Sequence, residues 1–91
     1  MITDVFIVYN DPSQRKRIED SLIRNPLFFT YINENSKNGR KEAFALKSHW
    51  GARMTPFILC MNKDKAIKAF YSENDKDVIN SLINYLNDIY S

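Results

Sequence analysis

The sequence has 91 residues but only one cysteine, one histidine and two glycines, and these shortages exclude several kinds of site. A single cysteine cannot form an internal disulfide, and with one histidine it supplies too few soft ligands for a structural zinc site. The single histidine also leaves no partner spacing that would support a Ser-His-Asp triad. Two glycines cannot build a glycine-rich phosphate loop. We therefore expect no metal ion and no cofactor.

Charge of one sign and long apolar runs are also scarce. The net charge is +2 at pH 7, which is too weak for the clearly basic face that nucleic-acid binding requires. No run approaches the roughly 18 consecutive apolar residues of a membrane span. The start of the chain has no secretory-signal pattern. We expect no nucleic-acid partner, no membrane partner and a cytoplasmic location.

What is present suits one small globular domain covering 1–91. Apolar residues make up 44% of the chain and aromatic residues 13%, which is ample for one buried core and leaves no room for a second. Asn, Ile, Lys and Tyr are used heavily, as expected for a protein from an AT-rich genome.

Apolar periodicity predicts four strands and three helices. The predicted strands are 5–9, 27–32, 57–61 and 66–72. The first helix is predicted to begin at Pro12 behind an Asp11 N-cap and to stop at Asn25-Pro26. The other helices are predicted at 40–50, with Gly51 as its stop, and at 76–90, with Asp75 and Asp77 as its N-terminal caps.

Each predicted helix has an apolar stripe that should face a sheet. The candidate core contacts of the second helix are Ala43, Phe44, Leu46 and Trp50. The stripe of the first helix is Ile18, Leu22 and Ile23, and that of the last helix is Val78, Ile79, Leu82, Ile83, Leu86, Ile89 and Tyr90. In the strand 66–72 we expect alternation, with Ile67 and Lys68 on opposite faces and the strand paired as a hairpin with 57–61.

The element order is βαβ-α-ββ-α. A strand, crossover helix and strand give a parallel pair, whereas the later hairpin is antiparallel. The sequence therefore predicts an α/β fold with a mixed four-stranded sheet flanked by helices.

This order resembles the thioredoxin and glutaredoxin superfamily. The sharpest likeness is Arg-Met-Thr-Pro at 53–56 before an apolar strand, which looks like the glutaredoxin pattern Arg-Thr-Val-Pro. The resemblance implies that Pro56 follows a cis peptide bond and faces the start of the first helix. Proline does no harm at the first residue of a strand, since its missing N–H breaks no ladder bond.

The residues that carry redox chemistry in this superfamily are missing. Tyr-Asn-Asp-Pro-Ser at 9–13 looks like the approach to Cys-x-x-Cys, and the resemblance then places the two cysteine positions at Gln14 and Arg17. Neither residue can form a thiolate. Ser-Glu-Asn-Asp-Lys-Asp at 72–77 replaces the expected glycine pair, so we expect no glutathione binding. The resemblance therefore implies a redox-inactive member and not an enzyme.

In active relatives the cis-proline face docks extended peptides, and without cysteines it would remain a peptide receptor. The helix start also has three consecutive cations, at 15–17, which either extend into water or bind an acidic partner or a phosphate. We predict a protein-binding module whose partner-binding residues are Asn10, Gln14, Arg15, Arg17, Thr55 and Pro56.

The short chain and its composition look similar to small phage-encoded thioredoxin-like proteins, acting as a virion component or as a binder of a host protein. Two alternatives stay open. One is a single-cysteine redox protein that uses Cys60, although an unpaired cysteine in a strand usually behaves as a small apolar residue. The other is an oligomeric structural subunit that uses the last helix, with Tyr85 and Tyr90, as its contact face.

Overall fold

The computed structural model describes residues 2–22 and 28–90, and it contains four strands and three helices in those residues. The strands are β1 (Asp4–Tyr9), β2 (Phe29–Asn33), β3 (Phe57–Asn62) and β4 (Lys65–Tyr71). The helices are α1 (Pro12–Leu22), α2 (Lys37–His49) and α3 (Asp75–Tyr90). The predictions for Ile23, Asn25-Pro26 and Leu27 lie outside the described residues.

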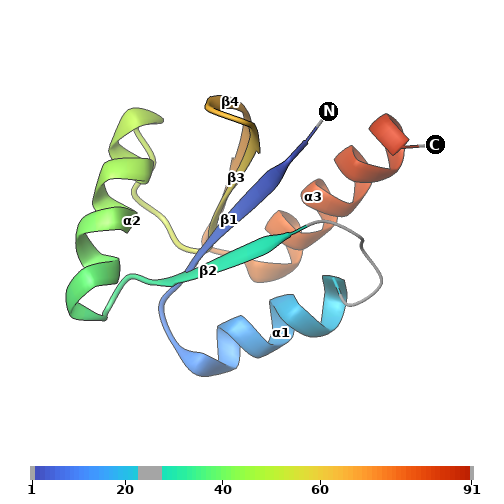
Figure 1. Ribbon diagram of the computed structural model, residues 1–91. Coiled ribbons are helices and arrows are strands. Elements are labelled where there is room, and N and C mark those ends of the chain that lie inside the picture. Colours follow the sequence, from blue (N-terminus) through green and yellow to red (C-terminus); the bar gives the residue numbers. More distant parts are fainter. Residues whose placement is uncertain (1, 23–27, 91) are drawn as a thin grey trace.

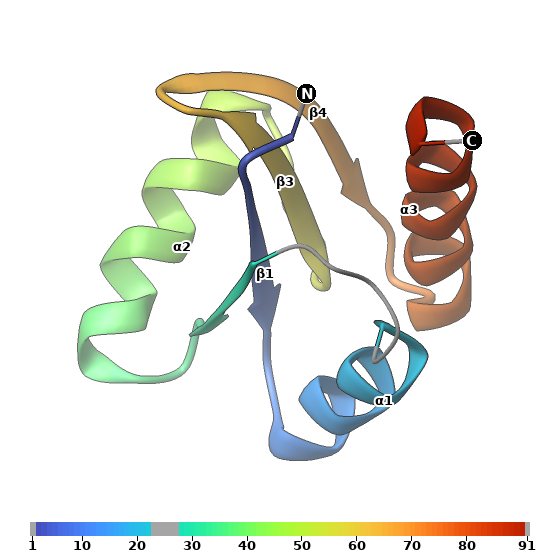
Figure 2. The same cartoon turned by 45° about the vertical axis from the view of Figure 1, so that its right-hand side comes forward.

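The four strands form one sheet in the order β2-β1-β3-β4. β1 pairs with β2 in parallel, and the β1–β3 and β3–β4 pairs are antiparallel. Helix α2 covers one face of the sheet, and α1 and α3 lie together on the other (Figures 1 and 2). The predicted α/β architecture is therefore confirmed.

The central strands β1 and β3 are buried on both faces, which explains their continuous apolar runs. Val8, Phe57 and Leu59 belong to the core layer under α2. Ile7 and Ile58 belong to the layer under α1 and α3. Because side chains alternate across a strand, these two strands hold both layers together.

Side chains cap the N-terminal ends of α1 and α3 and so define where each helix begins. Asp11 caps α1 as predicted, since its Oδ1 accepts a hydrogen bond from the Gln14 N–H at 2.9 Å. The predicted capping role of Asp75 and Asp77 is wrong. Asn74 Oδ1 accepts from the backbone N–H groups of Lys76 at 2.9 Å and Asp77 at 3.3 Å, so Asn74 is the cap. The Asp75 carboxylate is consequently free to contact another element.

Helix α2 begins at Lys37 rather than at the predicted Arg40. Its cap is Ser36, whose Oγ accepts from the Gly39 N–H at 3.0 Å and donates to the Asn33 carbonyl at 2.9 Å. The turn-forming residues Asn38 and Gly39 concealed this first turn in the sequence. Gly51, with a positive φ of 65°, ends the helix as predicted.

Phe44 is not a core residue, contrary to the prediction. Its side chain is 73% exposed, whereas Ala43 is buried and Leu46 and Trp50 pack against the same core layer. Successive residues of a helix are rotated by about 100°, so Phe44 turns away from the stripe of Ala43, Leu46 and Trp50 that faces the sheet.

A bulge in β4 overturns the predicted alternation of Ile67 and Lys68. Lys68 pairs with Cys60 and Ala66 with Met61, so Ile67 is an extra residue between the two pairs. Ile67 lines the same depression as Tyr85 of α3, and Lys68 lies over the ring of Phe70, which itself contacts Tyr85. Both side chains therefore lie on the α3 side, as the extra residue of a bulge allows.

The Gly39→Ala variant tests the tight first turn of α2. A Cβ at this position would lie 1.9 Å from the Asn33 carbonyl oxygen, which is backbone and cannot turn aside. Helix propensity alone would favour alanine by about 1 kcal/mol. We expect the opposite sign, a loss of about 1–3 kcal/mol of unfolding free energy from overpacking. Urea denaturation measures it.

The matched control is Asn38→Ala, one residue earlier and exposed, which should change the unfolding free energy by no more than about 0.5 kcal/mol. A Gly39→Ala variant as stable as the parent chain would contradict the described approach of this turn to β2.

Candidate functional site

The N-terminal ends of α1 and α3 meet the Thr55–Pro56 segment at one corner of the molecule. The Thr55–Pro56 peptide bond is cis, as predicted. A depression of about 610 Å³, called here the corner hollow, lies between the three segments. It is lined by Asn10, Asp11, Gln14, Arg17, Thr55, Glu73, Asn74, Asp75 and Lys76. Four of the six predicted site residues therefore come together here.

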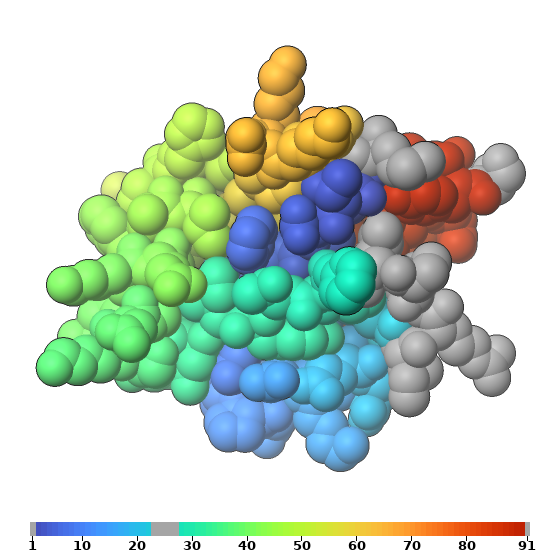
Figure 3. Space-filling model, viewed as in Figure 1, coloured from blue at the N-terminus to red at the C-terminus, as the bar shows by residue number. Residues whose placement is uncertain are grey.

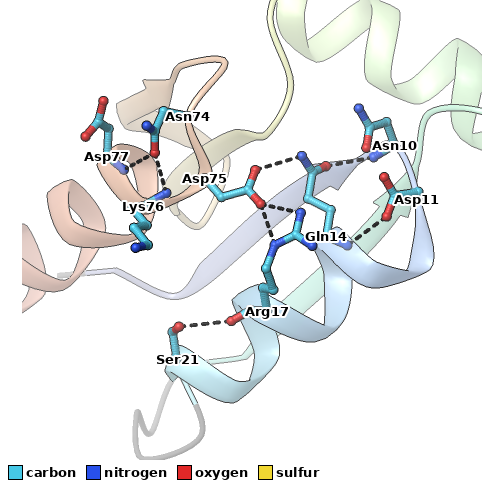
Figure 4. A network of polar contacts seen from close by, with 9 residues as sticks. All are labelled: Asn10, Asp11, Gln14, Arg17, Ser21, Asn74, Asp75, Lys76 and Asp77. Atoms are coloured by element: carbon cyan, nitrogen blue, oxygen red, sulfur yellow. Dashed lines mark hydrogen bonds and ion pairs between the residues drawn. The ribbon is translucent and has the colours of Figure 1, made fainter.

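Gln14 holds this corner together from the inside (Figure 4). Its side chain is 4% exposed. The amide oxygen accepts from the Asn10 N–H at 2.9 Å, and the amide nitrogen donates to Asp75 Oδ1 at 3.0 Å. Buried polar groups are costly unless they are hydrogen-bonded, and this amide is bonded at both ends. Gln14 is thus a bridge between α1 and α3, and a partner could reach little of it.

A signal for this role exists in the sequence. Asp11-Pro-Ser-Gln14 has the spacing of a capping box, in which the N3 glutamine reaches back to the start of its own helix. The partner Asp75 carries no such signal, since it is 61 residues further along the chain.

Arg17 also binds Asp75. Its Nε donates to Asp75 Oδ2 at 2.7 Å, so both carboxylate oxygens of Asp75 are engaged (Figure 4). The Asp75 side chain is only 16% exposed, whereas that of Arg17 is 55% exposed. Arg17 is consequently not the free cation that the sequence suggested, and reversing its charge would set two carboxylates against each other.

The two other cations of this cluster are paired as well. Arg15 forms a salt bridge with Glu19, and its guanidinium lies 4.7 Å from the centre of the Tyr31 ring. Lys16 lies 3.4 Å from a carboxylate oxygen of Asp20. Exposed pairs of this kind contribute little to stability, at most about 1 kcal/mol each. They do, however, neutralise charge with which this basic cluster could attract an acidic partner.

Pro56 and Thr55 lie on the cis-proline segment and have different surroundings. Pro56 is fully buried beneath the corner. The Thr55 hydroxyl donates to Glu34 Oε1 at 2.9 Å and accepts from Lys47 Nζ at 2.8 Å, while Lys47 and Glu34 lie 3.2 Å apart. This triangle joins the cis-proline segment to the end of β2 and to α2. Sequence reasoning missed Glu34 and Lys47, because no local pattern links residues on three separate elements.

Cys60 lies in the middle of β3 and its side chain is completely buried. Removal from water raises the pKa of this thiol to about 11, so it stays protonated at neutral pH. Among residues 2–22 and 28–90, no group of three or more His, Cys, Asp or Glu side chains could hold a metal ion. No helix in that part of the chain is long and apolar enough to cross a membrane.

Alkylation of Cys60 tests its burial. At pH 8, a pKa of about 11 leaves about one thiol in a thousand ionised. We expect iodoacetamide to label the native protein at least about 100-fold more slowly than the denatured protein. Mass spectrometry follows the reaction. A Ser13→Cys variant, with its new thiol at an exposed position, should take up one label quickly and the second slowly. Fast labelling of native Cys60 would contradict the structure.

Comparison with known proteins supports the fold. Neither the protein-family models nor the curated proteins gave a match to this sequence. Among solved structures, the chain is similar to thioredoxin 1 from the thermophilic eubacterium Thermosipho africanus TCF52B. The TM-score is 0.59 at 16% identity, over 98% of this chain and 100% of that chain. At this identity the similarity concerns the fold alone, and the chain has a thioredoxin-like fold.

Proposed function

We propose that this chain is a redox-inactive protein with a thioredoxin-like fold that works by binding another protein. The proposal rests on the positions and the bonds of Gln14 and Arg17. Both stand where the resemblance places the redox cysteines, and both are bonded to Asp75. Disulfide exchange needs an attacking thiolate, and the one cysteine of the chain is buried and protonated.

The proposed partner-binding face is the rim of the corner hollow. Asn10 is exposed, Thr55 is partly exposed, and both line the hollow with Arg17. Gln14 and Pro56 would act from beneath by fixing the shape of this rim, and Arg15 would flank it. An extended peptide that adds to a backbone edge gains main-chain hydrogen bonds without any covalent chemistry.

The proposed setting is a bacteriophage, in which the protein acts as a virion component or binds a host protein in the host cytoplasm. Its support is the resemblance to small phage-encoded thioredoxin-like proteins together with the Asn-, Ile- and Lys-rich composition.

One observation favours the alternative of an oligomeric subunit. A second depression, of about 300 Å³, lies between β4 and the end of α3 and is lined by Ile2, Ile67, Tyr85, Ile89 and Tyr90. Several of these side chains are partly exposed. The alternative that uses Cys60 as a redox thiol has less support, because burial removes both access and ionisation.

A photoreactive residue at Asn10 tests the proposed face. Asn10 supports the corner through its backbone, which bonds to Gln14 and to Asn35, so a new side chain leaves those contacts in place. With benzoylphenylalanine at this position in the source cell, we expect a discrete covalent adduct with one protein. The matched control carries the same group at Lys63, in the exposed β3–β4 turn. No adduct from Asn10, or the same adducts from both positions, would refute the proposed face.

A further inference from the structure

The positive charge of the chain is concentrated around α2. Residues 34–53 contain five of the 13 Lys and Arg residues but two of the 11 Asp and Glu residues. This segment therefore carries a formal charge of +3, whereas the rest of the chain carries −1. The weak overall charge hides a local excess on one face of the sheet.

The cations of α2 also differ from those of α1 in their pairing. All three cations at the start of α1 are paired with carboxylates. By contrast, no ion pair or hydrogen bond engages the side chains of Arg40 or Arg53 within the described part of the chain, and both residues are exposed. Unpaired arginines retain all their donors for a ligand, and their planar forks suit carboxylates.

These two arginines border a depression of about 590 Å³ beside α2, called here the α2 hollow. Ala43 and Ala52, both buried, contribute to its lining. Phe44, which was predicted to be a core residue but is exposed, also lines the hollow. Lys47 contributes a third cation, although it is tied to Glu34. The hollow thus combines an exposed aromatic ring, an apolar floor and an excess of positive charge.

Resting on the proposed function as a protein-binding module, we infer that the α2 hollow binds an acidic segment of the partner. Carboxylates of the segment pair with Arg40 and Arg53, and an apolar side chain between them packs on Phe44. Charge complementarity selects the acidic class. Aromatic and arginine residues are the side chains that most often dominate binding energy at protein interfaces.

Two other anionic partners fit less well. Single-stranded nucleic acid needs successive stacking platforms along a basic groove, and the α2 hollow offers one exposed ring. An anionic membrane surface favours a broad basic face, but Glu42 is an exposed residue of the same helix and Glu34 lines the hollow.

The position of the hollow suits a partner that also reaches the corner. Glu34 and Lys47 line the α2 hollow, and both bond to the hydroxyl of Thr55, which lines the corner hollow. A partner segment that lies in the corner hollow and continues past Thr55 would therefore next reach Arg53 and then α2. The α2 surface and the α3 surface lie on opposite sides of the molecule (Figure 3), so such a partner would not cover α3.

The experiment is an NMR titration of the isotope-labelled protein with a synthetic hexapeptide, Asp-Glu-Leu-Phe-Glu-Asp, blocked at both ends. We expect saturable shifts of the amide signals of Arg40, Phe44 and Arg53. The peptide with Asn and Gln in place of its acidic residues should bind at least about 10-fold more weakly, because its carboxylates are lost. This comparison uses the unaltered protein and requires no variant to fold.

Charge reversal then locates the site. Arg40→Glu/Arg53→Glu should weaken binding of the acidic peptide at least about 10-fold. Lys63→Glu/Lys65→Glu changes the net charge equally, at exposed positions in the β3–β4 turn and at the start of β4, and should change the affinity for the peptide by less than about 2-fold. Equal losses in both variants, no saturation at millimolar peptide, or shifts confined to the corner hollow would overturn the inference. Tighter binding of an oligothymidylate or of phosphatidylserine vesicles would also overturn it.

The outcome is separable from that of the proposed face. Peptide binding at Arg40 and Arg53 without an adduct from Asn10 would support the α2 hollow and refute the corner. An adduct from Asn10 without peptide binding would overturn the α2 hollow alone.

Discussion

The shape of the corner depends on one buried amide, that of Gln14. It bonds to the backbone of Asn10 at one end and to the Asp75 carboxylate at the other, and so ties the start of α1 to the start of α3. Arg17 completes the contact by neutralising Asp75. Where the resemblance places two reactive thiols, this chain has a fixed polar bridge. The start of α1, where the resemblance would place a thiolate, carries the buried Gln14 amide and the paired Arg17 instead.

The bridge has a consequence for the distribution of charge. Asp75, Glu19 and Asp20 pair with the three cations of α1, so these three cations contribute little free positive charge to the corner. The cations around α2 have only Glu34 and Glu42 near them in the sequence. Electrostatic attraction for an acidic partner is therefore expected beside α2 rather than at the start of α1. A rim charge acts mainly on association rate and specificity, so the two surfaces would contribute differently.

The sequence predicts the fold well because each central strand is a continuous apolar run and each helix has a clear stripe. It predicts details poorly where a local rule and a tertiary contact compete. Phe44 looks like a core residue by composition, but its position on α2 turns it to solvent. The first turn of α2 was not recognised in the sequence because it contains Gly39. A glycine is needed at this position because the backbone of Asn33 lies too close for a side chain. The role of Asp75 depends on α1, far away in the sequence, so no local pattern could reveal it.

The most direct measurement of the central claim is a double-mutant cycle on Gln14→Ala and Asp75→Ala, with unfolding free energies from urea denaturation. If the amide joins the two helices, the effects of the two changes are coupled by about 0.5–3 kcal/mol, because either single change leaves the other polar group without its partner. Additive effects, within about 0.5 kcal/mol, would contradict the bridge and with it the account of this corner as fixed by the Gln14 amide.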